Sequence, residues 1–192
     1  MKQRVLVIDN SFEQKIQLCI PKPKEQLEIV TYKNVDYTSH WEHSMWKSVD
    51  YDYLLVNLGN NPMEEELEFC QEIICVLSCE AFHIRAYQQF IQEVKKPFHL
   101  VFRNYCKNYM DTNKILHQLG ETSCFLVDKV FLPFIEMDEC LRVLMQVEGY
   151  RSLSGLSKEF EKAIFRLCRA ITNQDFTAVL NGLRRAKRGE CF

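Results

Sequence analysis

One stretch, Tyr51-Asp-Tyr-Leu-Leu-Val-Asn-Leu-Gly-Asn-Asn-Pro-Met63, indicates the architecture of this chain. Residues 53–58 form a compact apolar run that only Asn57 interrupts, and a Gly-Asn-Asn-Pro turn ends it before an acidic helix start at Glu64. A buried parallel strand that enters a helix through a tight loop has this pattern. Asn57 falls at the carboxyl end of the strand, where open α/β sheets place their binding sites.

Strand-like and helix-like patterns alternate on both sides of this stretch. The predicted strands are residues 4–8, 27–32, 51–58, 97–102 and 123–127. The predicted helices are residues 11–19, 111–119 and 137–147, together with two helices in residues 64–96 that break near residues 78–81. Residues 36–47 are expected to be irregular or helical. The alternation predicts an α/β fold with a five-stranded parallel sheet and helices on both faces.

The end of the chain departs from this alternation. Two amphipathic helices are predicted there, the first with apolar positions from Leu156 to Ile171 and the second with apolar positions from Phe176 to Leu183. We therefore expect an α/β domain over residues 1–149 and a two-helix extension over residues 150–192. The extension holds nine Lys or Arg and four Asp or Glu, a net charge of +5. Residues 1–149 hold 15 Lys or Arg and 22 Asp or Glu, a net charge of −7.

Composition and terminal patterns indicate a cytoplasmic protein. Hydrophobic residues make up 47% and charged residues 26% of the chain, which is ordinary for a soluble globular protein. No apolar run approaches the roughly 20 residues of a membrane span, and the first residues lack the pattern of a signal peptide. The nine cysteines include no Cys-x-x-Cys pair, so we expect buried thiols that act as small hydrophobes.

Several segments resemble bacterial response-regulator receiver domains. Residues 4–11 resemble their first strand and acidic pocket, and Tyr51–Met63 resembles the third strand with the Pro-Met pair that follows it. Residues 126–131 resemble the Lys-Pro-Phe segment of the fifth strand, and residues 138–141 resemble the start of the last helix. The resemblance covers roughly residues 4–148 and implies a flavodoxin-like fold, in which the first and third strands are neighbours.

The resemblance implies a degenerate phospho-acceptor pocket. Receiver domains use acids after the first and third strands to bind Mg²⁺ and accept a phosphoryl group, with a lysine and a hydroxyl nearby. This chain has Asp9 and Lys129, but it has Asn10 and Asn57 in place of acids. An amide is a poor nucleophile and brings no charge to a metal. We therefore expect an ion pair between Asp9 and Lys129, with no metal or cofactor.

The function implied is that of a non-catalytic pseudo-receiver. It would act in signal transduction, independently of phosphorylation, as a regulatory or adaptor protein through protein–protein contacts. Self-association as a homodimer or binding of a helical partner would provide those contacts, and no membrane contact is expected. An additional predicted helix over residues 82–95 and the terminal helices are the surfaces that would make them.

The basic extension allows a second interpretation, a DNA-binding transcription regulator with a receiver-like domain. Basic residues repeat along one side of the first terminal helix and cluster at the end of the second. They are Lys158, Lys162, Arg166, Arg169, Arg184, Arg185, Lys187 and Arg188. Such a stripe can follow a phosphate backbone or an acidic partner, but a solvated helix face has the same pattern.

A third interpretation is a small α/β enzyme that uses the crevice at Asp9, Asn57 and Lys129. Residues 5–10 also resemble the first strand of class I glutamine amidotransferases, but Cys70, Cys75 and Cys79 lack the flanking glycines of a nucleophile elbow. The segment His40-Trp-Glu-His43 could place two imidazoles on one metal, yet zinc needs three or four ligands. We therefore expect no catalytic residue and no metal site.

Overall fold

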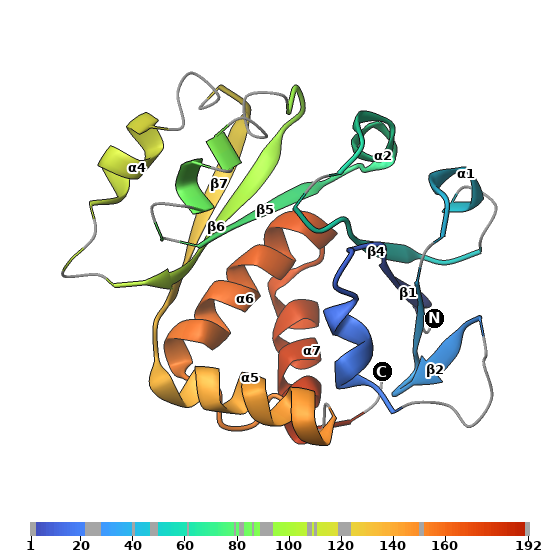
Figure 1. Cartoon of the computed structure of the whole chain (residues 1–192). Coiled ribbons are helices and arrows are strands. Elements are labelled where there is room, and N and C mark those ends of the chain that lie inside the picture. Colours follow the sequence, from blue (N-terminus) through green and yellow to red (C-terminus); the bar gives the residue numbers. More distant parts are fainter. Residues whose placement is uncertain are drawn as a thin grey trace. The chain divides into compact units, whose positions relative to one another are not determined.

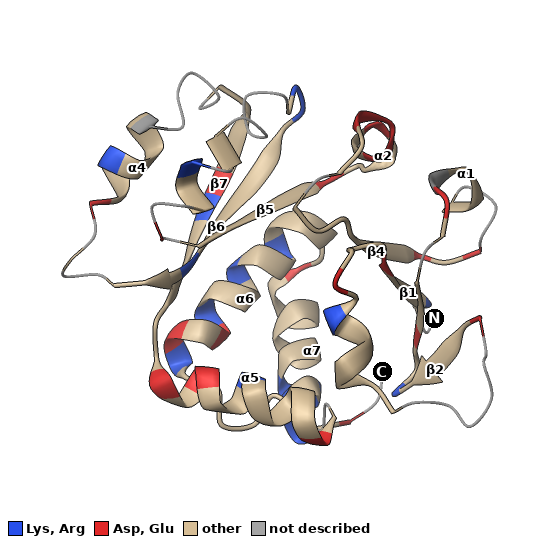
Figure 2. Cartoon of the chain, in the orientation of Figure 1, with Lys and Arg blue, Asp and Glu red and all other residues tan. Residues whose placement is uncertain are grey.

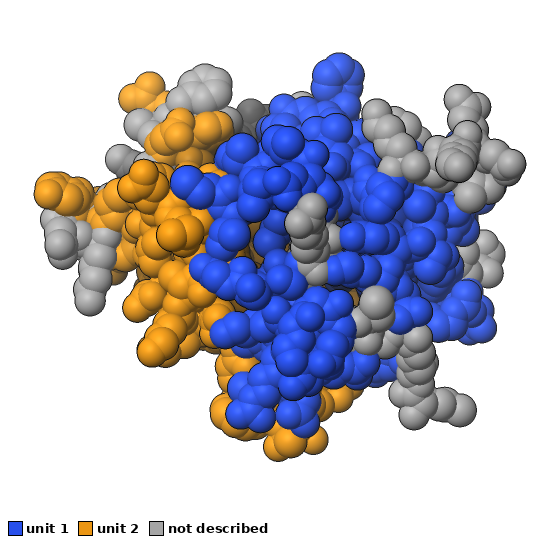
Figure 3. All heavy atoms as spheres, turned by 90° about the horizontal axis from the view of Figure 1, so that it is seen from below, with its two compact units in different colours: residues 1–66, 140–155, 180–192 blue, residues 67–139, 156–179 orange. Residues whose placement is uncertain are grey.

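The computed structural model describes residues 3–21, 28–39, 41–46, 50–60, 62–78, 80, 83–85, 87–88, 94–106, 109, 111–118, 124–149 and 152–190. The chain divides into two compact units (Figure 3). Unit 1 consists of residues 1–66, 140–155 and 180–192, and unit 2 of residues 67–139 and 156–179. Both units take residues from each side of the boundary expected at residue 149, and that boundary stays a prediction.

Unit 1 contains a four-stranded sheet in the order β2-β3-β1-β4 (Figure 1). β1 (Val5–Asp9) pairs in parallel with both β3 (Val35–Ser39) and β4 (Tyr53–Asn57). β2 (Val30–Tyr32) pairs with β3 in antiparallel orientation. The two residues between them, Lys33 and Asn34, have φ angles of 51° and 59°, as a tight two-residue hairpin turn requires.

Short helices follow the strands of unit 1. The 3-10 helix η1 (Lys15–Cys19) follows β1, and α1 (His43–Trp46) follows β3. The helix α2 (Glu64–Phe69) begins in unit 1 after β4. The expectation for residues 36–47 was wrong in its first part, because Val35–Ser39 is a strand. Its valine, tyrosine and threonine favour extended backbone.

Unit 2 contains three parallel strands in the order β5-β6-β7. They are β5 (Ile73–Ser78), β6 (Phe98–Tyr105) and β7 (Leu126–Pro133). One face of this sheet carries an apolar cluster whose buried members are Ile73, Cys75, Leu77, Ile84, Val94, Phe98, Leu100, Phe102 and Ile115. On the other face, Val101 and Val130 pack against Ala163 of α6 (Lys158–Thr172).

Further helices are α4 (Thr112–Gln118), α5 (Glu136–Glu148) and α7 (Phe176–Arg188). The helices predicted for residues 137–147 and for the end of the chain are thereby confirmed. Most of the additional helix predicted over residues 82–95 lies outside the described residues, although residues 83–85 and 87–88 are helical. No helix in the part of the chain that the structure describes is both long and apolar enough to cross a membrane.

The α/β class is confirmed, but the five-stranded flavodoxin-like sheet was wrong. The described strands form one sheet of four and one of three, and the first contains an antiparallel pair. The largest error concerns residues 73–78, predicted as part of a helix and found as β5. Burial alternates along this strand, with Ile73, Cys75 and Leu77 directed into the apolar cluster. A short continuous apolar run fits a helix and a strand equally well, so its sequence alone cannot separate them.

Candidate functional site

The polar residues Asp9 and Asn57 meet at the carboxyl edge of the unit 1 sheet. Asp9 ends β1 and Asn57 ends β4, and the two residues are register partners in the parallel pair. The side chain of Asp9 is almost fully buried, at 1% relative exposure. A buried carboxylate is stable only where hydrogen-bond donors surround it, so its partners determine what this site can do.

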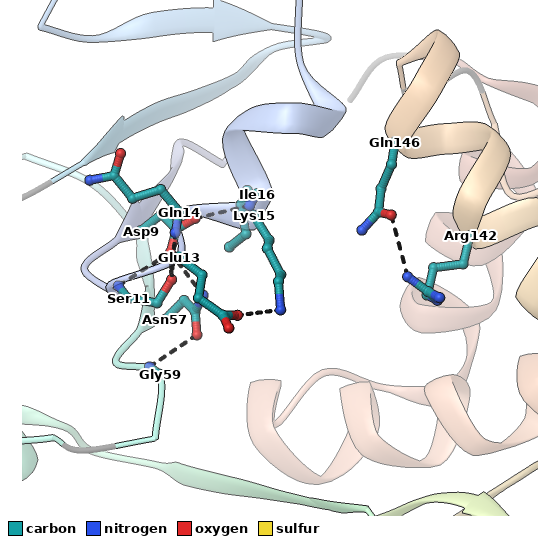
Figure 4. A network of polar contacts seen from close by, with 10 residues as sticks. All are labelled: Asp9, Ser11, Glu13, Gln14, Lys15, Ile16, Asn57, Gly59, Arg142 and Gln146. Carbon is teal, nitrogen blue, oxygen red and sulfur yellow. Dashed lines mark hydrogen bonds and ion pairs between the residues drawn. The ribbon is translucent and has the colours of Figure 1, made fainter.

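The Asp9 carboxylate accepts four hydrogen bonds (Figure 4). Its Oδ1 atom accepts from the Ser11 hydroxyl at 2.6 Å, from the Ser11 backbone N–H at 3.3 Å and from Asn57 Nδ2 at 2.8 Å. Its Oδ2 atom accepts from the Ile16 backbone N–H at 2.9 Å. Backbone N–H groups after a strand are the donors that bind anions in many α/β proteins, and here the chain's own carboxylate holds two of them.

Other amides of the loop after β1 are also bonded within unit 1. Asn10 N donates to the Asn57 carbonyl at 3.0 Å, and Gln14 N donates to the Ser11 carbonyl at 3.3 Å. Gln14 has a positive φ of 46°, which is unusual for a residue that is not glycine. Gly59 approaches the loop so closely that an added Cβ would lie 3.1 Å from the Cβ of Ser11. The loop is therefore closed onto Asp9 and β4.

Asn10 bonds through its side chain to the backbone of Trp41. Its Nδ2 donates to the Trp41 carbonyl at 2.8 Å, and its Oδ1 accepts from Trp41 N at 3.1 Å. Its Nδ2 atom also lies 3.5 Å from Oε1 of the buried Glu66, whose Oε2 accepts from Met63 N at 2.9 Å. Asn10 thus ties together the loops that follow β1, β3 and β4.

Trp41 and Glu66 were missed by the analysis of the sequence. Glu66 is one of three consecutive glutamates at a helix start, and nothing in the sequence distinguishes it from its exposed neighbours. Trp41 offered a weak signal, because a tryptophan in a polar segment that follows a strand is commonly buried for packing. Its backbone contact with Asn10 depends on strand order, which the sequence did not provide.

Lys129 lies on β7 of unit 2, where its register partner is Leu100 of β6. Asp9 and Asn57 belong to unit 1, so the ion pair expected between Asp9 and Lys129 stays a prediction. Arg103, near the end of β6, donates from Nη2 to Glu139 Oε1 at 3.1 Å. The described contacts of the site therefore come from Asp9, Asn10 and Asn57 without Lys129.

Figure 2 shows the basic residues of α6 and α7 in blue. Most of the basic residues named for the extension are exposed, and several have partners. Arg166 forms a bidentate ion pair with Asp128 of β7, with Nε donating to Oδ2 at 2.9 Å. The Arg169 guanidinium lies 5.9 Å from the ring centre of Phe176. On α7, Arg188 Nε lies 2.6 Å from a carboxylate oxygen of Glu190. Binding of nucleic acid by this group of residues stays a prediction.

The cysteines are free thiols in the described part of the chain, and only Cys75 among them is buried. Burial raises the pKa of the Cys75 thiol to about 12. The expectation of buried thiols was wrong for Cys106, Cys124 and Cys140, which are exposed. Cys79, His40 and the side chain of His43 lie outside the described residues. Among the residues described, no group of three or more His, Cys, Asp or Glu side chains is arranged to hold a metal.

Comparisons with known proteins give similarity at the level of fold. No family model matches the chain, and no curated protein sequence matches it. The MinD cell division protein of Aquifex aeolicus has a similar structure, with a TM-score of 0.62 and 13% sequence identity over 90% of this chain and 86% of that chain. The ParA family ATPase of Chlorobium tepidum TLS has a TM-score of 0.55 and 16% identity over 85% of this chain and 87% of that chain.

These similarities correct the interpretation of the sequence as a receiver domain. The chain has the fold of the MinD and ParA structures over most of its length, so the pseudo-receiver assignment and the response-regulator function were wrong. The receiver-like layout assumed for a transcription regulator was wrong for the same reason. Two of the misleading motifs, those of Asp9 and Asn57, sit at the carboxyl ends of parallel strands, and open α/β sheets of different families place polar residues there alike.

Proposed function

We propose that this chain is a binding protein with the fold of the MinD and ParA structures, and that it does not bind nucleotide phosphates at the loop after β1. The similarity of fold supports the first half of this proposal. The second half is carried by one observation, the hydrogen bonds of the Asp9 carboxylate with the loop amides of Ser11 and Ile16.

Nucleotide binding at such a loop has structural demands that this chain does not meet. Phosphate-binding loops use glycines so that several backbone N–H groups can point at the phosphates, with a lysine and a hydroxyl beside them. Residues 10–15 read Asn-Ser-Phe-Glu-Gln-Lys and include no glycine. The carboxylate of Asp9 already occupies loop donors that a phosphate would need. The residues present therefore do not fit a nucleotide phosphate.

Charge adds to this misfit. A phosphate oxygen placed about 4 Å from the Asp9 carboxylate would be repelled by about 1–4 kcal/mol per pair of unit charges, for effective dielectric constants between water and a protein surface. Glu13, in the same loop, adds a second negative charge beside its ion pair with Lys15. Since the loop has to open and Asp9 has to find new donors as well, phosphate binding there is unfavourable.

Exposed apolar side chains support a binding role. Three apolar side chains of α5 are exposed, and Val147, at 79%, is the most exposed of them. The other two, Val143 and Leu144, lie four and three residues before it on the helix. Phe12, in the loop after β1, is 100% exposed. Contiguous exposed apolar groups on a folded protein commonly mark contacts with another macromolecule. We infer that this protein functions by association with a protein partner or with its own copies.

A second candidate function is that of a nucleotide-binding ATPase, which the similarity to a ParA family ATPase favours. It requires the loop after β1 to open and to release Asp9 from Ser11 and Ile16. Equilibrium anisotropy of a fluorescent ATP analogue, with Mg²⁺ and separately with EDTA, decides between the two. We expect no saturable binding and no phosphate release above that of buffer. Saturable, Mg²⁺-dependent binding would overturn the proposal and support the ATPase.

A further inference from the structure

The carboxyl edge of the unit 1 sheet is one continuous group of loops. Asn10 bonds to the backbone of Trp41, and its Nδ2 lies 3.5 Å from Glu66, while Gly59 contacts Ser11. The loops that follow β1, β3 and β4 are thereby held against one another. Side chains that leave these loops toward solvent therefore share one surface.

This surface is acidic and carries apolar groups. Phe12 is 100% and Met63 is 54% exposed. The exposed side chains of Glu13, Glu42, Glu64 and Glu65 come from these loops and from the start of α2, and Figure 2 shows the acidic residues of α2 in red. Lys15, paired with Glu13, is the only basic residue among those described in the three loops. We call the six residues Phe12, Glu13, Glu42, Met63, Glu64 and Glu65 the acidic edge.

Unit 1 also contains a surface of the opposite charge, at the end of α7. Arg184, Arg185, Lys187 and Arg188 fall within five consecutive residues, and the three arginines are exposed. Arg185 and Arg188 both contact the carboxylate of Glu190, at 4.0 Å and 2.6 Å. We call these four residues the basic end.

We propose that unit 1 associates with a second copy of this chain head to tail, with the acidic edge of one copy against the basic end of the next. The proposal rests on the proposed function, because a nucleotide held at the loop after β1 would change the charge of the acidic edge. Charge complementarity favours a second copy as the occupant, since this chain itself carries an exposed cationic cluster that matches its acidic edge.

The chemistry of the two surfaces suits this contact. Phe12 offers an aromatic face to arginine, and the apolar stems of Arg184 and Arg188 can cover it while their guanidinium groups reach Glu64 and Glu65. Central aromatic anchors and arginines commonly carry most of the affinity of an interface. Because different surfaces of the two copies meet, the contact is heterologous and extends into a ring or an open chain.

Size-exclusion chromatography with light scattering tests the contact on the full chain. We expect a mass above that of the monomer at about 50 mM salt and a monomer near 1 M salt, where the Debye length falls to about 3 Å. Phe12→Ala is expected to weaken the low-salt association about tenfold, the usual loss when an anchor residue is truncated. A monomer under all conditions, or an association that salt leaves unchanged, would overturn the proposal.

Charge exchange makes the test specific to these two surfaces. The edge variant Glu64→Lys with Glu65→Lys and the tail variant Arg184→Glu with Arg188→Glu are each expected to be monomeric. An equal mixture of the two should associate again, because the unmodified basic end of the edge variant meets the unmodified acidic edge of the tail variant, and the two reversed surfaces also match in charge. A mixture that stays monomeric, while circular dichroism shows both variants folded, contradicts the head-to-tail contact.

A matched control reverses two exposed charges elsewhere. Glu136→Lys with Glu159→Lys lies on α5 and α6, away from both surfaces in sequence, and is expected to associate as the unmodified chain does. Repeating the measurement with MgATP separates this inference from the proposed function. Association that appears only with MgATP would overturn the proposed function as well, whereas a monomer throughout would overturn the head-to-tail contact alone.

Discussion

The two sheets of this protein contain parallel strands, but they bury different kinds of side chains. In unit 2, the central strand β6 buries Phe98, Leu100 and Phe102 in one apolar cluster. In unit 1, the central strand β1 buries Leu6 and Ile8 but ends in the buried Asp9, while Leu55 of β4 is 48% exposed. Among the described residues, buried apolar side chains are therefore concentrated in unit 2, and the polar contacts around Asp9 lie in unit 1.

A buried polar group of unit 2 sharpens this difference. His99 of β6 is buried, and its Nε2 lies 3.3 Å from Glu72 Oε2. Its position is next to the first residue of β6, at the amino end of the strand, whereas Asp9 and Asn57 are the last residues of their strands. Binding sites of open α/β sheets form at the carboxyl ends of the strands. Asp9 and Asn57 are therefore placed where a ligand can bind, whereas His99 is not.

The largest expected effect is loss of the unit 2 core through Phe102→Ala. Phe102 is 0% exposed and stacks on Phe131 with ring centres 5.1 Å apart. Its removal leaves a cavity and should lower the free energy of unfolding by about 3–5 kcal/mol in urea denaturation. Leu55→Ala in unit 1 is the matched control and should cost about 1 kcal/mol or less, because that side chain is half exposed. Equal losses in the free energy of unfolding for the two variants would contradict the difference in apolar packing between the two sheets.

Asp9→Ala should have the next largest effect, about 3 kcal/mol, because it leaves the buried donors of Ser11, Ile16 and Asn57 without their acceptor. Asp52→Ala is the control. Its carboxylate also accepts a backbone N–H, from Arg4 at 2.7 Å, but it does so at the surface and should cost about 1 kcal/mol. The measurement is again urea unfolding. A loss for Asp9→Ala no greater than that of the control would show that the polar site contributes little to unit 1.

A smaller effect is expected for Lys96→Met, which tests polar support at the rim of unit 2. Lys96 Nζ donates to the carbonyls of Leu67, Glu68 and Cys70 at 3.2, 2.6 and 3.4 Å, around the end of α2. Loss of these charged hydrogen bonds should cost about 1–2 kcal/mol. Lys114→Met, on the exposed side of α4, should leave the melting temperature unchanged. A melting temperature for Lys96→Met equal to that of Lys114→Met would contradict this role.

The last expected effect concerns pH and is absent at neutrality. The ordinary pKa of a thiol is 9.0, and burial raises the pKa of Cys75 to about 12 in the folded chain. Between these values the folded state holds a proton that the unfolded state has lost, so the free energy of unfolding should fall as pH rises. Cys75→Ala should remove this contribution in unfolding curves recorded from pH 8 to about 11. If the free energy of unfolding of Cys75→Ala depends on pH as that of the unmodified chain does, Cys75 does not make this contribution.

The sequence predicted the edge of unit 1 better than the order of the strands. Asp9 and Asn57 were expected at the ends of strands that neighbour each other, and they are hydrogen-bonded at 2.8 Å. The place of each residue at a strand end depended only on local features, an apolar run that ends in a polar residue before a turn, whereas the neighbouring of the two strands was implied by the receiver resemblance. The contacts between Asn10 and Trp41 could not be predicted in this way. They depend on which loops the order of the strands brings together, and no local pattern contains that order.

Two misassigned segments show where local patterns fail. The run Ile73-Ile74-Cys75-Val76-Leu77 suits a helix and a strand alike, and its identity as a strand is fixed by pairing with β6. The hairpin between β2 and β3 turns at Lys33-Asn34, which lacks the glycine that commonly marks such turns. The receiver resemblance failed for a related reason, since its motifs at Asp9 and Asn57 are features of parallel strand ends in general and do not identify a family.

The most direct test of the central claim observes the amides of Ser11 and Ile16 by ¹⁵N–¹H NMR during titration with MgATP. If the carboxylate of Asp9 holds these two groups, their resonances should shift in Asp9→Ala and stay unchanged in the unmodified chain up to millimolar MgATP. A saturable shift of both resonances in the unmodified chain would show that a nucleotide displaces Asp9, and would contradict the account given for this site.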